Sequence, residues 1–324
     1  MATRPHPSPR SINAHQGISV MTSLSRRAFT LAGIGLAGAS LLPGRAFAQG
    51  EMRSVTTSLG TYDIPARPQR VVAIDSRLDM QPALALGLPI VGYGHSVPGA
   101  WVPIGKDVAF VGSEVNVEQV LALDPDLIIC SDYDPDSVWW PLNKLRQIAP
   151  VLPTKGDDTW RNQFRTLAGF LGMEGGAEGA IAGYDALVDG VQAKHGSKLG
   201  EKTVISVQPD AGGLWPMNGS NMLHAQVLAD LGAKTIPPGD LQKYEAEKVT
   251  SESFLDVLGE VDGFLLATTG TDETNVLSKE PLWQRLPAVA AGAVVASKGN
   301  VNYGSIYSAT HLVHLFDELY GKIA

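Results

Sequence analysis

Aromatic and hydrogen-bonding side chains follow several apolar runs of this sequence, and these residue types are suited to binding a ligand. Asp75, Ser76 and Arg77 come directly after the run 71–74. Arg77 is the leading candidate donor, because its planar guanidinium can donate two parallel hydrogen bonds to one ligand. Aromatic walls with a few such donors suit a large, partly apolar ligand with exposed oxygen atoms. The other candidate ligand-binding residues are Tyr93, His95, Trp101, Tyr133, Trp139, Trp140, Trp215, Tyr303 and Tyr307.

The residues that would support catalysis or a bound metal are not arranged for it. After residue 48 the sequence has no G-x-G-x-x-G, no G-x-x-x-x-G-K-[ST] and no G-x-S-x-G. Cys130 ends an apolar run and is expected to be buried filler rather than a nucleophile. His311 and His314 lack a carboxylate in register, so we expect them to be packed or solvated. We therefore expect no enzyme, no metal site and no cofactor, with an exported enzyme as the alternative from another class.

The elements that must position these side chains alternate along the chain. Short β-branched runs at 71–74, 90–93 and 125–129 enclose helix-like stretches at 80–86 and 117–123. Continuous apolar strands between helices indicate a mostly parallel sheet that is covered on both faces. Ligands bind such sheets beyond the carboxyl ends of the strands, which is where the candidate residues fall.

A second series of the same kind follows, so the predicted fold is α/β with two lobes. Its expected strands are 203–207, 263–267 and 293–296, and its expected helices are 222–231, 253–258 and 306–320. Between the lobes, 159–171 and 177–191 have helical spacing, and Gly172, Gly175 and Gly176 are expected to separate them. The predicted divisions are a lobe at 49–173, a connecting helix at 174–196 and a second lobe at 197–324.

Residues 1–48 have the features of an export signal. Arg26 and Arg27 precede the uncharged stretch 28–44, and Ala46-Phe47-Ala48 supplies a small-residue cleavage site. Paired arginines before such a stretch favour the Tat exporter, followed by removal of the leader by signal peptidase after about Ala48 and a periplasmic location. The Sec route and a start at Met21 remain open.

The mature chain is acidic. It keeps 20 of the 25 Lys and Arg residues and all 33 Asp and Glu residues, which gives a net charge of −13. Such a surface repels nucleic acid and favours solubility, so we expect no nucleic-acid partner. The protein is also expected to be a monomer. The single cysteine cannot form an internal disulfide, and no cysteine at the cleavage site offers a lipid anchor.

Several segments, in order, resemble the periplasmic binding proteins for ferric siderophores, haem and cobalamin, in particular the iron-hydroxamate type. The segments are 67–73, 84–88, 116–129, 252–255 and 281–289. The resemblance implies two α/β lobes joined by one long helix, with the ligand in the cleft between them. It also implies an ABC importer, with Glu118 and Glu252 docking onto its permease, and Glu245, Glu247 or Asp256 as alternatives to Glu252.

The resemblance implies a ferric siderophore as the ligand, with iron(III) carried inside it. Tyr133 falls where the hydroxamate binders place a cleft tyrosine, but the arginine that they carry after the Val-Gly pair is replaced by Ser113-Glu114. Arg77 would have to substitute for it. Haem and cobalamin remain alternatives, and Tyr133, His95 and Tyr303 are the candidate axial ligands for haem.

Overall fold

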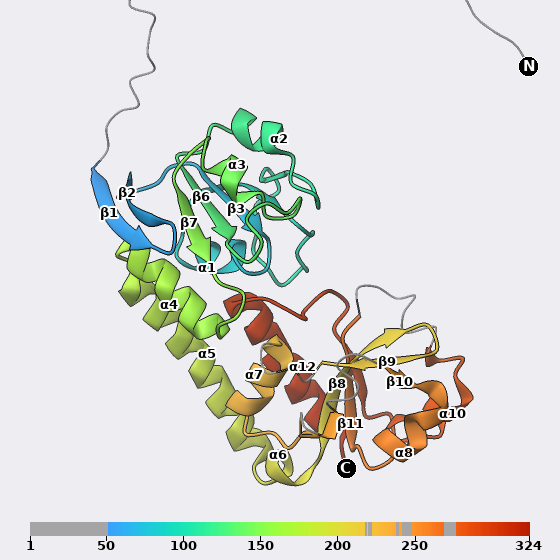
Figure 1. Ribbon diagram of the computed structural model, residues 1–324. Helices are drawn as coiled ribbons and strands as arrows, with labels where there is room; N and C mark the ends of the chain where they lie inside the picture. The colour runs from blue at the N-terminus through green and yellow to red at the C-terminus, as the bar shows by residue number, and fades with distance from the viewer. Residues whose placement is uncertain (1–50, 218, 220–221, 238–239, 242–247, 269–276) are drawn as a thin grey trace, which may run out of the picture. The chain divides into compact units, whose positions relative to one another are not determined.

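A computed structural model describes residues 51–217, 219, 222–237, 240–241, 248–268 and 277–324. The predicted signal at 1–48 and the alternative docking residues Glu245 and Glu247 lie outside the described residues. The described chain forms two five-stranded sheets and a two-stranded hairpin, with helices packed on the sheets (Figure 1). No helix within these ranges is both long enough and apolar enough to cross a bilayer.

The first sheet is parallel throughout, with the strand order β5-β4-β3-β6-β7. Strands β3 and β6 are buried along their whole length, as their continuous apolar runs predict. Helices α2 and α3 cover one face, where Cys130 is buried as expected, and α1 and α4 cover the other. The bounds are β3 Val71–Asp75, α1 Met80–Ala85, β4 Ile90–Gly94, β5 Ala109–Phe110, α2 Val117–Ala122, β6 Leu127–Ser131, α3 Leu142–Leu145 and β7 Val151–Thr154.

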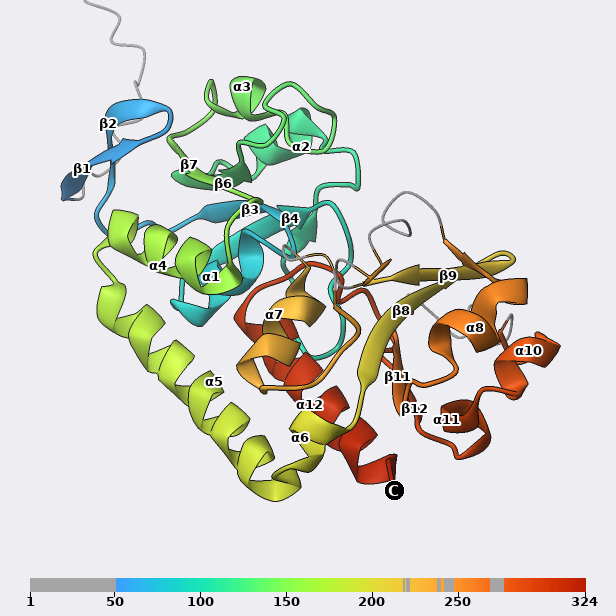
Figure 2. The same cartoon turned by 60° about the horizontal axis from the view of Figure 1, so that its bottom comes forward.

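Two helices lead from this sheet to the second one (Figure 2). The hydroxyl of Thr159 accepts a hydrogen bond from the Asn162 amide at the start of α4, Trp160–Leu171, and Gly172 ends that helix in the left-handed conformation (φ 67°). Helix α5, Glu174–His195, follows after one further residue. The expectation that Gly175 and Gly176 separate the helices is therefore wrong, since both lie in the first turn of α5, and Gly172 alone makes the break.

The second sheet has the order β10-β9-β8-β11-β12 and is mixed. Strands β8, β11 and β12 are parallel, whereas β9 and β10 add on antiparallel. The predicted two-lobe α/β class is confirmed, with the antiparallel edge as the departure. The bounds are α6 Lys198–Glu201, β8 Val204–Asp210, β9 Gly213–Pro216, α7 Leu223–Asp230, β10 Val249–Thr250, the 3-10 helix η2 Ser251–Ser253, α8 Phe254–Leu258, β11 Gly263–Leu266, α10 Pro281–Gln284, α11 Pro287–Ala290, β12 Val294–Ala296 and α12 Ile306–Lys322.

The hairpin of β1, Met52–Thr57, and β2, Gly60–Pro65, precedes both sheets and was not predicted. Its strands are half exposed and contain no continuous apolar run. The Tyr62 hydroxyl donates to the carbonyl of Val151, and Arg53 donates to the carbonyl of Gly169 at the end of α4 (3.2 Å). These two contacts fasten the hairpin to the first lobe.

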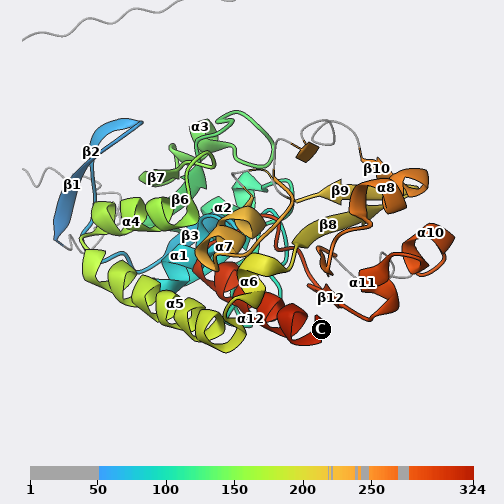
Figure 3. The ribbon, with the colours of Figure 1, turned by 90° about the horizontal axis from the view of Figure 1, so that it is seen from below.

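One hydrophobic core continues from the first lobe into the second. It joins Val71 and Ile129 of the first sheet to Ile205 and Phe264 of the second, through side chains of α1, α4, α5, α7 and α12. Helix α12 contacts α1, α5 and α7 as well as β11 and β12, and Figure 3 shows α5 and α12 side by side. The lobes are therefore packed against each other, and α5 is not their only connection.

A buried glutamine adds a polar link between the lobes. Gln81 of α1 is 2% exposed, and its Oε1 accepts hydrogen bonds from the amides of Ser305 (3.2 Å) and Ser308 (2.9 Å). Its Nε2 donates to the Ser308 hydroxyl (2.8 Å). The first amides of a helix have no partner inside the helix, so Gln81 caps the start of α12 from the other lobe.

Candidate functional site

The candidate site lies where β3, β4 and β6 end, at the carboxyl edge of the first sheet. Asp75 is the last residue of β3 and is fully buried. Its Oδ1 accepts hydrogen bonds from the amides of Arg77 (2.8 Å) and Leu78 (3.3 Å), which turns the chain sharply after the strand. This turn directs Arg77 back over the carboxylate.

Arg77 and Asp75 form a bidentate ion pair. Arg77 Nε donates to Oδ1 (3.0 Å) and Nη2 donates to Oδ2 (2.8 Å), and the arginine side chain is only 13% exposed. Burial alone would raise the pKa of Asp75, but the adjacent guanidinium holds that pKa below its ordinary value. The expected fork of Arg77 therefore exists, but it is directed at Asp75.

His95 extends this pair along the edge of the sheet. It has a positive φ of 68°, and its Nε2 lies 2.9 Å from Arg77 Nη2. A guanidinium only donates, so Nε2 accepts and the ring carries its proton on Nδ1. Burial lowers the pKa of His95, and the charge of Arg77 lowers it further, whereas Asp75 opposes the shift. The imidazole is therefore neutral at pH 7.

Three aromatic side chains after β6 form a wall beside the ion pair. Trp140 lies 5.5 Å from the His95 ring and donates from Nε1 to Asp75 Oδ2 (3.4 Å). Tyr133 and Trp139 contact Trp140 edge-on, with ring centroids 6.4 and 6.2 Å away. Tyr133 is 76% exposed and Trp139 is 48% exposed. Such exposure is unusual for large aromatic rings and leaves their surfaces available to a ligand.

The second lobe contributes Tyr303, from the segment between β12 and α12. The guanidinium carbon of Arg77 lies 5.4 Å from the centre of the Tyr303 ring, a cation–π distance. The site thus joins a charged pair and an aromatic wall of one lobe to an aromatic ring of the other. Six predicted residues meet here, namely Arg77, His95, Tyr133, Trp139, Trp140 and Tyr303.

The remaining predicted residues lie elsewhere. Tyr93 is 8% exposed, belongs to the core and contacts the exposed ring of Phe110. Trp215 donates to Asp210 (3.1 Å) at the β8–β9 turn, and Tyr307 packs against the core. The structure shows no contact between these three side chains and the ion pair.

Trp101 links the lobes instead of joining the aromatic wall. Its ring stacks on His311 of α12, with centroids 4.0 Å apart, and its Nε1 donates to the Ser308 hydroxyl (3.3 Å). A Cβ on Gly299 would lie 2.6 Å from the indole, so the second lobe needs a glycine there to admit the ring. Among the described residues no group of three or more His, Cys, Asp and Glu side chains could hold a metal ion, and His311 is engaged in this stack.

A second buried carboxyl, Asp79, lies behind the ion pair and was not predicted. Its Oδ2 accepts from the Asp75 amide (2.7 Å) and its Oδ1 accepts from the Thr154 hydroxyl (2.5 Å). Burial and the charge of Asp75 raise the pKa of Asp79 to about 7. The sequence signals were an acidic residue directly after the run 71–74 and another one four residues later, and only the first of them, Asp75, was named beside Arg77.

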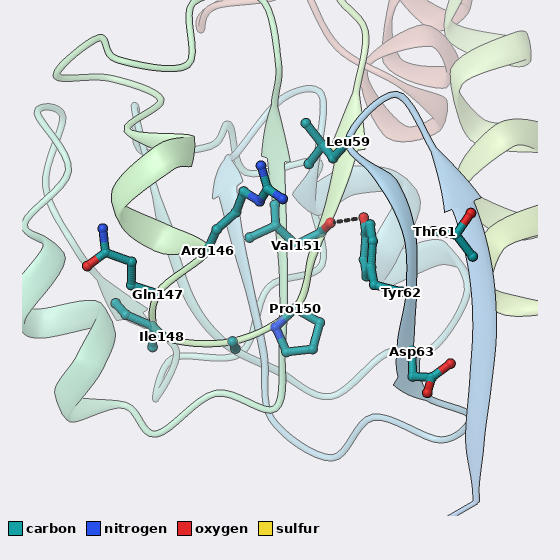
Figure 4. A pocket seen from close by; sticks show the side chains of 10 residues that line it. Leu59, Thr61, Tyr62, Asp63, Arg146, Gln147, Ile148, Pro150 and Val151 are labelled. Atoms are coloured by element: carbon teal, nitrogen blue, oxygen red, sulfur yellow. Dashed lines mark hydrogen bonds between the residues drawn. The ribbon is translucent and has the colours of Figure 1, made fainter.

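A pocket of about 450 Å³ lies at the opposite edge of the same sheet (Figure 4). It is bounded by β2 and by the segment that leads into the amino end of β7, with Tyr62 and Arg146 on its two sides. The pocket is shallow and contains none of the predicted residues. Ligands of parallel α/β sheets bind at the carboxyl edge, so the ion pair and not this pocket is the candidate site.

The two candidate docking carboxylates are both exposed at helix starts. Glu118 lies in the first turn of α2, which Asn116 caps by accepting from the Gln119 amide (3.1 Å). Glu252 lies in η2, directly before α8. Each lobe therefore presents one such glutamate on its surface.

Comparison with known proteins places this geometry among binding proteins. Residues 76–301 match the family described as "Periplasmic binding protein". The ferric enterobactin-binding periplasmic protein FepB of Escherichia coli O6:H1 is 26% identical, over 93% of this chain and 99% of FepB. A periplasmic solute binding protein from Mycobacterium smegmatis matches with a TM-score of 0.69 and 19% identity, over 84% of this chain and 98% of that chain. The Fe³⁺–Desferal-bound siderophore binding protein FhuD of Vibrio cholerae matches with a TM-score of 0.64 and 23% identity, over 79% and 99% of the two chains.

Proposed function

Because the chain belongs to the periplasmic binding protein family, we propose that it captures a ferric siderophore between its lobes and delivers it to the permease of an ABC importer. The names of the relatives support the ligand class, since FepB binds ferric enterobactin and the Vibrio cholerae protein holds Fe³⁺–Desferal. The observation that carries the proposal is the aromatic wall beside the Arg77–Asp75 pair. In the same place, Arg77 contacts the ring of Tyr303 from the second lobe.

This site favours binding over catalysis. Asp79, the carboxyl with a pKa near neutrality, is fully buried and both of its oxygens accept protein hydrogen bonds. No substrate can reach it, so the perturbed pKa does not mark a general acid or base. The most exposed side chains of the wall, Tyr133 and Trp139, are aromatic and supply contact area for a ligand.

Delivery to the permease would use Glu118 and Glu252. Exposed carboxylates at helix starts are available to arginines of a partner, and one on each lobe allows a two-point contact. The location follows from the leader: we propose Tat export, cleavage after about Ala48 and a free, monomeric protein in the periplasm.

The test is a tryptophan fluorescence titration of the mature protein, residues 49–324, with ferric hydroxamate, catecholate and carboxylate siderophores, haemin and cobalamin. At least one ferric siderophore is expected to quench with a Kd below about 10 μM. Trp139→Leu should remove a large share of the quenching, because Trp139 is the most exposed tryptophan of the wall. Quenching by none of these ligands would contradict the proposed function.

Haem is the second candidate, and it depends on Tyr133. The Tyr133 side chain is largely exposed and leaves its hydroxyl accessible as an axial ligand, whereas His95 Nε2 is occupied by Arg77. An iron-porphyrin absorbance band that is lost in Tyr133→Phe, with no response to any siderophore, would replace the siderophore proposal by haem binding.

A further inference from the structure

We infer that this site selects ferric chelates that carry no net negative charge, neutral or cationic ones, and discriminates against anionic chelates. The inference rests on the proposed function and narrows its ligand class. It follows from how the charges of the site are already paired before any ligand arrives.

The charge of Arg77 is neutralised inside the protein. Both of its inward donors bind Asp75, which is fully buried and also accepts from the amides of Arg77 and Leu78 and from Trp140. A carboxylate with this many donors stays ionised and keeps its cation close. The pair therefore presents a ligand with hydrogen-bond donors but with no net positive charge.

The described groups in contact with the pair do not restore a positive charge. His95 accepts a hydrogen bond from Arg77 through Nε2, so the imidazole is neutral. A proton on Nε2 would point at the guanidinium and break this hydrogen bond. Asp79 lies behind the pair and adds negative charge whenever it is ionised. The inner part of the site is thus neutral or negative.

The surrounding segments are acidic. The segment after β6, which carries the aromatic wall, contains Asp132, Asp134 and Asp136 and no cation. The segment after β7 has Lys155 followed by Asp157 and Asp158, all exposed. In the described part of the second lobe, Lys298 is the cation of the segment after β12. Together these three segments contain five carboxylates and two cations, a balance that repels an anion and attracts a cation.

Ferric chelates differ in net charge, so the acidic surroundings of the site should favour some chelates over others. Three hydroxamates bring three negative charges and neutralise Fe³⁺, whereas three catecholates bring six and leave the chelate triply anionic. An uncharged chelate needs only apolar contact and a few donors, which Tyr133, Trp139 and Arg77 supply. A pendant ammonium would gain further from the faces of the aromatic rings.

A series of chelates that differ only in charge tests this. Fe³⁺–Desferal carries a pendant ammonium, its N-acetyl derivative is neutral, and its N-succinyl derivative is anionic, while the iron centre is the same in all three. We expect the succinyl derivative to bind at least about fivefold more weakly than the acetyl derivative at low ionic strength. The gap should shrink as salt is added, because screening weakens interactions between exposed charges. A ferric tris-catecholate should bind more weakly still.

A charge-reversal variant with a matched control locates the effect. Asp134→Lys changes an exposed residue next to Tyr133 and should strengthen binding of the succinyl derivative by about threefold or more. Asp63→Lys makes the same change on β2, away from the carboxyl edge, and should leave all three affinities unchanged.

The outcomes separate this inference from the proposed function. Equal or tighter binding of the succinyl derivative or of the tris-catecholate would overturn the charge selectivity and leave siderophore capture intact. An equal response of the two lysine variants would also overturn it, since the preference would then come from the overall charge of the protein. Failure of every ferric chelate to bind would instead reject the proposed function itself.

Discussion

Asp75 determines the character of the site at the scale of single residues. It ends β3, turns the chain and accepts the fork that Arg77 would otherwise offer to a ligand. The amino-acid sequence identifies Arg77 as the donor because arginine follows an apolar run. It does not show that the carboxylate two residues earlier binds the guanidinium, since that geometry depends on the turn.

Removal of Arg77 should destabilise the fold as well as the complex. Arg77→Ala leaves the buried Asp75 carboxylate without its cation, so we expect a loss of about 3 kcal/mol in the free energy of unfolding. Ligand affinity, measured on the folded variant, should fall by at least about 1.5 kcal/mol. Urea denaturation and fluorescence titration measure the two effects separately.

The double variant Asp75→Asn with Arg77→Gln is the control for Arg77→Ala. It removes both charges together and should recover part of the stability, because no unpaired buried charge remains. Equal stability of Arg77→Ala and the wild type would show that the ion pair is not formed in solution.

Asp79 should make the stability of the protein depend on pH. Its pKa is raised to about 7 in the folded chain, mainly by burial, from an ordinary value near 4. Between these values the folded chain keeps a proton that the unfolded chain releases, so the contribution of Asp79 to stability is full below about pH 4 and is lost as the pH rises through about 7. In Asp79→Asn this part of the pH dependence should disappear. The variant should be less stable overall, because its side-chain amide accepts from only one of the two donors, the Asp75 amide and the Thr154 hydroxyl. Urea denaturation of both proteins from pH 4 to 8 tests the difference, and parallel curves would contradict it.

At the scale of elements, Gln81 of the first lobe caps the start of α12 in the second. Gln81→Met keeps the length of the side chain but removes all three hydrogen bonds to Ser305 and Ser308. We expect a loss of about 3 kcal/mol in the free energy of unfolding, because the first amides of α12 are buried and lose their partner.

Gln119→Met is the matched control for this cap. Gln119 is exposed on α2, so the same substitution there should change stability by less than about 0.5 kcal/mol. Faster hydrogen exchange confined to the first turn of α12 in Gln81→Met would locate the defect. Equal effects of the two substitutions would contradict a capping role.

The sequence predicts elements well where the burial is continuous. Strands β3 and β6 and helices α4 and α12 lie within a few residues of their expected bounds, because their apolar residues recur with the period of the element. The sequence does not predict the hairpin of β1 and β2 or the short strands β5, β9 and β10, because these elements are brief or half exposed. The cap of α12 by Gln81 joins residues 224 or more positions apart, and no local pattern reports such a contact.

At the largest scale, the described residues from Glu51 to Ala324 form one compact unit. The main core runs through both lobes, and α12 packs on elements of each. Unfolding of one lobe would therefore expose apolar surface of the other. We expect a single cooperative transition in which near-UV and far-UV circular dichroism coincide. Two separated transitions would show that the lobes fold independently.

The contacts of Trp101 with the second lobe make its fluorescence a reporter of how the two lobes are placed. Its indole stacks on His311 and hydrogen bonds to Ser308, both in the second lobe, while Trp160 and Trp283 are fixed in the core. Its emission therefore responds to the spacing of the lobes, whereas that of Trp139 responds to a ligand on the wall. Two single-tryptophan variants, one that retains Trp101 and one that retains Trp139, would therefore report lobe movement and ligand capture separately.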